Sequence, residues 1–387
     1  MNTKTNTKLI LSTSHNAKSF ADNENEFLQK NAFLKVCKLI KDSLVIKKII
    51  SPSDDTNFYE TRGHYSILVN GKRGSGKTTF ALTAIKLLEV GKQAKQSKID
   101  QKDQIVIEKG DIEKGDIVNL GILDPTLIDS KEHVLLAVIT KIKEKVEHHF
   151  KNEFDTTRDN SSMFSKHIHP LDDWREALRK LAQGLQQLDG VGKDSMQDSI
   201  WEDPVTIMEE GLQSIKAGLE LNKRLHYFID KSLELLKAKA FILVLDDIDT
   251  FFEKGWPVLE SLRKYLTTPK LVTLVCGDLQ LYQAQVQRQQ WLQLGDLATK
   301  FESDTKNRKN HEAMIHALTE QYLLKVLPAN RRVELDVVAD LGDSVDVYQD
   351  EAAQQAQQTG SSIKLKDHIN DLIKESYLLA PETPEGR

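Results

Sequence analysis

Short apolar runs alternate with longer segments of helical periodicity along most of the chain. Each run has the length of one buried strand, whereas the segments between them repeat apolar residues every three or four positions. Strands that alternate with helices predict a parallel sheet covered by helices on both faces. We therefore expect an α/β fold, a three-layer sandwich around a parallel sheet, with a helical insertion and helical flanks. The predicted strands are residues 65–69, 116–123, 241–245, 271–276 and 333–338.

Shifts in composition divide the chain into predicted parts. Two separated stretches make one α/β core, and a helical insertion interrupts it. The C-terminal stretch begins as a Gln-rich linker, so we expect a helical or lid region to start there and the chain to be the N-terminal part of a longer protein. The parts are an N-terminal helical segment (1–60), the first core part (61–150), the insertion (151–239), the second core part (240–341) and the linker with its following helix (342–387).

Charge and cysteine content narrow the function classes. The net charge of −5 over 387 residues gives no overall attraction to nucleic acid or to anionic lipid. No apolar run approaches the roughly 18 residues that span a bilayer, so no membrane contact is expected. Only Cys37 and Cys276 are present, both in apolar runs, which favours free thiols in the cytoplasm.

The segment after the first predicted strand matches the phosphate-loop pattern G-x-x-x-x-G-K-[ST] and leads into a helical repeat. Its glycines let backbone N–H groups surround a phosphate, and the helix N-terminus adds partial positive charge. Lys77 is expected to reach the β- and γ-phosphates of ATP, and the Thr78 hydroxyl to ligate Mg²⁺. The alternative is a glycine-rich turn before an ordinary helix. The expected nucleotide-binding residues are Gly71, Arg73, Gly74, Ser75, Gly76, Lys77, Thr78 and Thr79.

The apolar run at 241–245 ends in Asp-Asp-Ile-Asp. Five consecutive apolar residues predict a strand buried on both faces, whose end brings carboxylates to the sheet edge where ligands bind in open α/β folds. Asp246 is expected to hold Mg²⁺ opposite Thr78, and Asp247 to orient or deprotonate the attacking water. The alternative is a strand that simply meets a turn, and Asp249 either joins this site or begins the next loop.

Three further residues are candidates for catalysis. Asp278 follows the strand at 271–276, where a polar side chain would touch the γ-phosphate or the water, unless it is a plain turn residue. Arg331 and Arg332 precede the last predicted strand and are expected to reach the γ-phosphate of a neighbouring subunit, since a guanidinium donates to two phosphate oxygens. The alternative for this pair is two surface arginines in a loop.

Taken in order, these motifs resemble the additional-strand P-loop ATPases of the AAA+, STAND and KAP group. The sequence Asp-Asp-Ile-Asp is similar to the KAP-type D-D-[LI]-D signature, and residues 322–335 resemble the segment that ends the core of that group. Within the group, the chain most resembles the ATPase subunits of RADAR anti-phage systems, partly through residues 120–128. That resemblance implies a ring-shaped homo-oligomer, an adenosine deaminase partner, and action on adenosine nucleotides or RNA during infection.

Three functions therefore stay open from the sequence. The first is an oligomeric, Mg²⁺-dependent ATPase of a bacterial antiviral complex. The second is a nucleotide-gated scaffold that hydrolyses ATP negligibly. The third is a nucleic-acid translocase, which would need basic, aromatic-interleaved surfaces, whereas the chain shows only scattered lysines.

Overall fold

The computed structural model contains a five-stranded sheet whose strands all run parallel. Strand β5 lies at its centre, between the strand that precedes the glycine loop and the strand that ends in the carboxylates. In order across the sheet, the strands are β3 (Ile117–Leu123), β4 (Ala240–Leu245), β5 (Leu271–Gly277), β2 (Ile67–Asn70) and β6 (Arg332–Glu334). The structure describes residues 7–10, 29–45, 58, 62–90, 112–113, 115–128, 133–150, 170–185, 212, 215–216, 218–249, 252–301, 305–336, 345–348, 363–364, 366–367 and 369–371.

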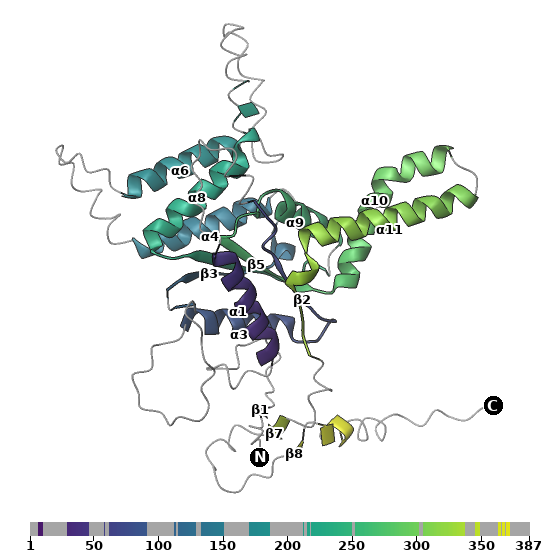
Figure 1. Ribbon diagram of the computed structural model, residues 1–387, viewed down its shortest axis with the longest axis horizontal. Helices are drawn as coiled ribbons and strands as arrows, with labels where there is room; N and C mark the ends of the chain where they lie inside the picture. The colour runs from purple at the N-terminus through teal and green to yellow at the C-terminus, as the bar shows by residue number, and fades with distance from the viewer. Residues whose placement is uncertain are drawn as a thin grey trace, which may run out of the picture.

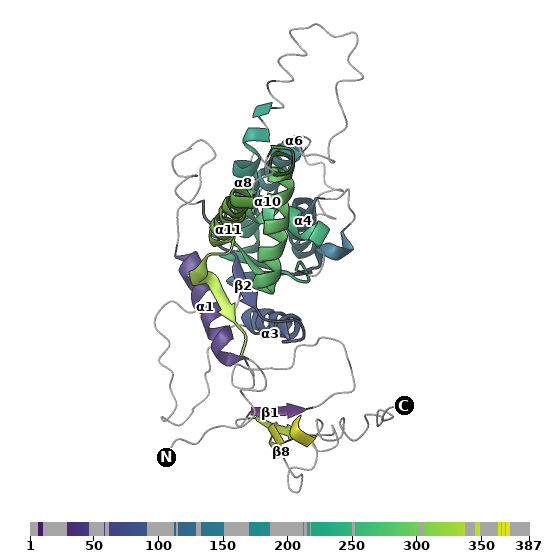
Figure 2. The same ribbon diagram turned by 90° about the vertical axis from the view of Figure 1, so that its right-hand side faces the viewer.

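Strand side chains alternate between the two faces of the sheet, and both faces are buried. In β4, Phe241 and Leu243 belong to one hydrophobic core and Ile242 and Val244 to the other. Helices lie on both sides of the sheet (Figures 1 and 2). The fold is therefore a three-layer α/β arrangement around a parallel sheet, as predicted. The helices of one core are α1 (Lys30–Leu44) and α3 (Lys77–Val90), and those of the other include α4 (Val134–His149), α8 (Leu221–Leu236) and α9 (Phe252–Lys264).

Two helices of the predicted insertion form part of the main core. Helix α6 (Pro170–Leu185) packs against α8, where the buried Trp174 Nε1 donates a hydrogen bond to Ser232 Oγ at 2.9 Å. Phe228 and Ile229 of α8 are fully buried in the same core as α4 and the sheet. These helices therefore help to cover one face of the sheet.

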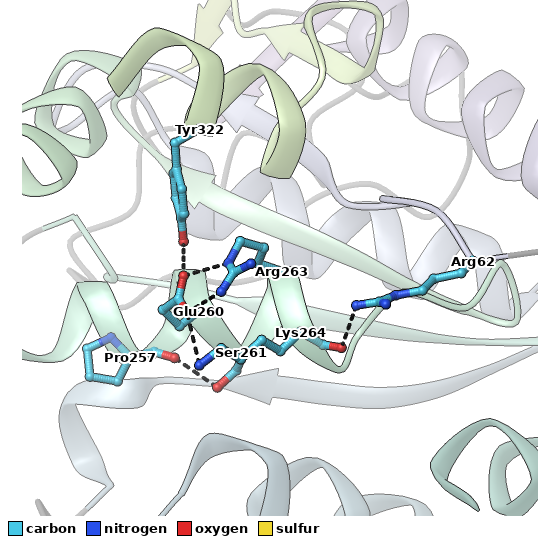
Figure 3. Close-up of polar contacts among 7 residues, drawn as sticks. All are labelled: Arg62, Pro257, Glu260, Ser261, Arg263, Lys264 and Tyr322. Carbon is cyan, nitrogen blue, oxygen red and sulfur yellow. Dashed lines mark hydrogen bonds and ion pairs between the residues drawn. The ribbon is translucent and has the colours of Figure 1, made fainter. Parts of the chain in front are cut away.

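Helices α10 (Leu279–Phe301) and α11 (Thr305–Val326) form a hairpin that begins at the tip of β5 and returns to β6 (Figure 1). Helix α11 of this hairpin contacts α9. The Tyr322 hydroxyl donates to Glu260 Oε1 at 2.9 Å, and the Tyr322 ring stacks on Trp256 at 5.1 Å. Figure 3 shows Glu260 also receiving two hydrogen bonds from Arg263, at 2.7 and 2.8 Å. Arg62, ahead of β2, donates to the Lys264 carbonyl oxygen at 3.4 Å in the same view.

A second sheet joins segments from opposite ends of the chain. Strand β1 (Thr7–Ile10) pairs in parallel with β7 (Val345–Tyr348), which pairs antiparallel with β8 (Ile363–Lys364). The sequence predicts a loosely ordered start and a polar linker here, so these strands are additional to the prediction. Among the described helices, none has the length and apolarity needed to cross a membrane.

Two local predictions differ from the structure. The sequence predicts that Asp129, with Glu132 at the third position, caps the next helix. In the structure α4 begins at Val134 and its N-cap is His133, whose Nδ1 accepts from the Leu135 amide at 3.1 Å. Asp129 itself lies outside the described residues. The last strand is shorter than predicted, because β6 ends at Glu334. The structure also has two 3₁₀ turns, η1 (Pro125–Leu127) and η2 (Ala329–Arg331).

Candidate functional site

The glycine loop between β2 and α3 has a backbone that other residues would not fit. Gly74 and Gly76 have φ angles of +81° and +82°, which side-chain-bearing residues disfavour. A Cβ on Gly71 would collide with Ser75 Oγ. Within the part of the chain that the structure describes, Ser75 Oγ is buried and has no hydrogen-bond partner. This compact cradle with an unused hydroxyl fits an oxygen-rich anion such as a phosphate chain.

Lys77 turns its ammonium group back over this loop. Its Nζ donates to the carbonyl oxygens of Gly71 at 2.9 Å and Lys72 at 3.2 Å. Lys77 is the first residue of α3, and the half-buried Thr78 and Thr79 follow in the first helical turn. The positive end of the helix, the lysine charge and two hydroxyl groups therefore lie at the same point. Arg73 and Gly74 are exposed at the outer part of the loop.

The two carboxylates after β4 have different environments. Asp246 is buried, with 5% of its surface exposed, and its amide donates to the Leu123 carbonyl oxygen at 3.2 Å. Asp247 is exposed and has a φ angle of +55°. Such a left-handed conformation is uncommon outside glycine, although Asp tolerates it, and it is frequent at functional sites. The turn therefore directs two adjacent residues into different surroundings.

The electrostatics of Asp247 connect this carboxylate loop with the glycine loop. Although the Asp247 side chain is exposed overall, partial loss of water around its carboxyl group raises its pKa, and the negative charges of Asp246 and Asp124 raise it further. The positive charges of Lys77 and Arg73 lower the pKa of Asp247. Charges of both loops thus interact across the tip of β5, and a carboxylate with a raised pKa is a stronger base.

Asp124 lies near this site, although we did not predict it as a site residue from the sequence. It follows β3 directly, beside the end of β4, and its carboxylate caps η1 by accepting from the Thr126 amide at 2.8 Å and the Thr126 hydroxyl at 2.6 Å. The sequence signal was present, because Asp124 ends an apolar run as Asp246 does. Only the neighbouring positions of β3 and β4 bring the two carboxylates to the same edge.

Asp278 lies at the tip of β5, as predicted, and begins α10. Its Oδ1 accepts from the Gln280 amide at 2.9 Å, so the side chain caps this helix. Its own amide donates to Asp249 Oδ2 at 2.7 Å. Asp249 is buried, with 4% of its surface exposed, and so has a structural contact within the site rather than only starting a loop.

The predicted arginine pair is split by the fold. Arg331 is 9% exposed, and its guanidinium donates four hydrogen bonds to α1 and to residues just before β2. This placement does not suit the predicted contact with a neighbouring subunit, because the group already serves buried acceptors at the amino end of the sheet. Arg332 is half-buried, and its Nε donates to the Leu327 carbonyl oxygen at 3.0 Å. Burial lowers the pKa of both arginines.

Among the described residues, no group of three or more His, Cys, Asp or Glu side chains is arranged to hold a metal ion. A Mg²⁺ ion at this edge would combine the Asp246 carboxylate with the Thr78 hydroxyl group and phosphate oxygens. No protein-family model matches the chain, and no curated protein matches it either.

Proposed function

We propose that the chain is a Mg²⁺-dependent ATPase with a P-loop fold of the additional-strand type. One observation carries the proposal. Strand β5 separates the strand of the glycine loop from the strand of the carboxylates, yet Asp247 interacts electrostatically with Lys77 and Arg73. Because β2, β4 and β5 are parallel, the glycine loop and the carboxylate loop leave the same edge of the sheet. A phosphate chain on the glycine loop would extend towards Asp247, as phosphoryl transfer to water needs.

Each residue has a separate task in this proposal. The glycine-loop amides and Lys77 bind the phosphates, and Ser75 offers its hydroxyl to them. Thr78 and Asp246 would hold Mg²⁺, which neutralises charge on the phosphate oxygens when it is bound. Asp247 orients the attacking water and accepts its proton. Asp278 lies at the tip of the neighbouring strand β5.

The test of the nucleotide site uses two lysines of the same helix. Lys77→Ala should weaken ATP binding at least about 100-fold in calorimetry, because its charge offsets that of the β- and γ-phosphates. Lys86→Ala, about two and a half turns further along α3, should bind ATP like the parent. Equal affinity of the folded Lys77→Ala variant and the parent would rule out the loop as a nucleotide site.

The sequence resemblance supports a wider proposal, in which the ATPase is a ring-forming component of an antiviral complex with an adenosine deaminase. Its support is the likeness of residues 120–128 and of the ordered motifs. Particle images of the purified protein with ATP test the ring. A scaffold without hydrolysis would show no steady-state phosphate release, and a translocase would bind nucleic acid in a salt-dependent way.

A further inference from the structure

Two side chains on either side of β5 hold consecutive backbone amides at its tip. The Asp278 amide donates to Asp249 Oδ2 at 2.7 Å, and the Leu279 amide donates to Asn70 Oδ1 at 2.9 Å. Asp249 belongs to the carboxylate loop after β4, whereas Asn70 is the last residue of β2, directly before the glycine loop. The turn from β5 to α10 is thus held from both sides.

Further hydrogen bonds extend this set of contacts beyond β2, β4 and β5. Asn70 also donates from Nδ2 to Glu334 Oε2 at 2.6 Å, which reaches β6. On the other side, Gln285 of α10 donates from Nε2 to the Ile248 carbonyl oxygen at 3.0 Å, in the carboxylate loop. We call Glu334, Asn70, Leu279, Asp278 and Asp249 the strand-end network, since together they connect the ends of β6, β2, β5 and β4.

The buried carboxylate of Asp249 has a hydrogen-bonding role and does not only fill space. A carboxylate that is 4% exposed loses most of its hydration, which costs free energy unless strong hydrogen bonds replace it. Its short bond to a backbone amide is of the charge-assisted kind. The amides at the start of a helix have no partner inside that helix, so they are suitable donors for side chains of neighbouring strands.

We propose that Asn70 and Asp249 are positioning residues, which set the separation between the glycine loop and the carboxylate loop by holding the tip of β5 between them. The inference rests on the proposed ATPase function. Strand hydrogen bonds of β2, β4 and β5 end at this edge, so the network carries the alignment of the sheet onward into the loops. Alignment matters here, because a misplacement of about 1 Å can reduce turnover about 100-fold.

The test compares variants that remove the side-chain acceptor of Asn70 or Asp249 with a variant that keeps it. Asp249→Ala and Asn70→Ala should each lower ATP turnover about tenfold to 100-fold, since the water and phosphate are misaligned. ATP affinity should stay within about threefold, because neither side chain belongs to the glycine loop. Asp249→Asn keeps an acceptor oxygen and should recover most of the turnover. The double variant should lose less than the product of the single losses, as expected for residues of one unit.

Hydrogen exchange supplies a readout that does not depend on catalysis. In nucleotide-free protein, the Asp278 amide should lose protection in Asp249→Ala, and the Leu279 amide in Asn70→Ala. Asp230→Asn is the control at the opposite end of β5, where Asp230 is buried and pairs with Lys270 at 2.8 Å. This variant should lose stability but keep its turnover within about twofold of the parent.

Two results would overturn the proposal. Either amide could keep its protection in the alanine variant, or turnover could match that of the parent although protection is lost. Failure of the ATPase proposal itself is recognised separately, because Lys77→Ala would then hydrolyse ATP at the rate of the parent.

Discussion

Arg331 donates from Nη2 to the Tyr65 carbonyl oxygen at 3.0 Å, and its guanidinium carbon lies 5.8 Å from the centre of the Tyr65 ring. The same side chain donates to the Ser66 carbonyl oxygen at 3.3 Å, to the Leu39 carbonyl oxygen at 3.4 Å and to Ser43 Oγ at 2.9 Å. One guanidinium therefore connects η2, α1 and the entry to β2. This is a structural task that suits the planar, five-donor geometry of arginine.

Arg331→Ala should therefore lower the free energy of unfolding by about 2–4 kcal/mol, because buried acceptors lose their donor and a cavity forms. Arg331→Lys should recover only part of the lost unfolding free energy, since an ammonium group cannot reach all four acceptors. Urea unfolding followed by circular dichroism measures both. Arg175→Ala, which removes an exposed side chain of α6, is the control and should change the midpoint little. An unchanged midpoint in Arg331→Ala would contradict this structural role.

Substitutions of Asp246 and Asp247 should have different effects on ATP turnover. Asp247→Asn preserves side-chain size and tolerates the left-handed backbone, so it should bind Mg-ATP within about threefold of the parent but turn over about 100-fold more slowly. Asp246→Asn should instead raise the Mg²⁺ concentration for half-maximal turnover about tenfold. Steady-state phosphate release across a magnesium series measures both effects. Should Asp247→Asn keep the turnover of the parent, another carboxylate such as Asp124 or Asp278 positions the water.

The strand–loop–helix unit around Lys77 and the carboxylate strand could be predicted because their signals are local. A run of apolar residues that ends in glycines or aspartates specifies a buried strand and its tip within about ten residues. The strand at 271–276 follows the same reasoning, and the structure has Asp278 at the tip of β5, whereas the central place of β5 in the sheet is seen only in the structure. The coarse fold and the positions of these side chains were therefore accessible from the sequence.

Contacts between distant segments could not be predicted in this way. Asn70 bonds to Glu334 across 264 positions, and Arg331 bonds to Ser43 across 288. No local pattern distinguishes a buried arginine from an exposed one, so Arg331 and Arg332 resemble one another in the sequence although the fold separates them. The pairing of β1 with β7 was missed for the same reason, since each strand is only four residues long.

Glu260 should make stability depend on acid pH. Burial alone would raise the pKa of Glu260, but hydrogen bonds from Arg263, Tyr322 and Lys264 outweigh it and lower the pKa from 4.5 to about 2. A folded-state pKa below the unfolded value means that the ionised group stabilises the fold above pH 4.5, and that this contribution is lost as the pH falls towards 2.

Glu260→Gln should accordingly lower the free energy of unfolding by about 1–2 kcal/mol at neutral pH, after allowance for solvent screening. The difference from the parent should shrink as the pH falls from 4.5 towards 2. Urea titrations across this range test it. Glu147→Gln removes an exposed partner of Lys143 and should unfold like the parent at every pH. A difference that stays constant with pH would show that packing, rather than charge, is responsible.

Arg332 remains the candidate for completing the site of a neighbouring subunit. It pairs with Leu68 in the register of β6 and β2, so the glycine loop of its own subunit begins about 10 Å further along the strand. Its Nε bond to Leu327 draws the side chain towards the opposite, amino end of the sheet. This bond holds the side chain away from the glycine loop of its own subunit, so we propose that its catalytic contact is made in trans.

Arg332→Ala should bind ATP like the parent but hydrolyse it about 10³-fold more slowly, the smaller of the effects known for such arginines. Mixing it with Lys77→Ala protein should restore part of the activity, because an intact site on one subunit can meet an intact arginine on the next. The matched control is a mixture of Lys77→Ala with a Lys77→Ala, Arg332→Ala double variant, which contains no intact site and should stay inactive. Phosphate release after subunit exchange measures the recovery. If mixed assemblies form but the first mixture stays as inactive as the control, Arg332 does not act across an interface.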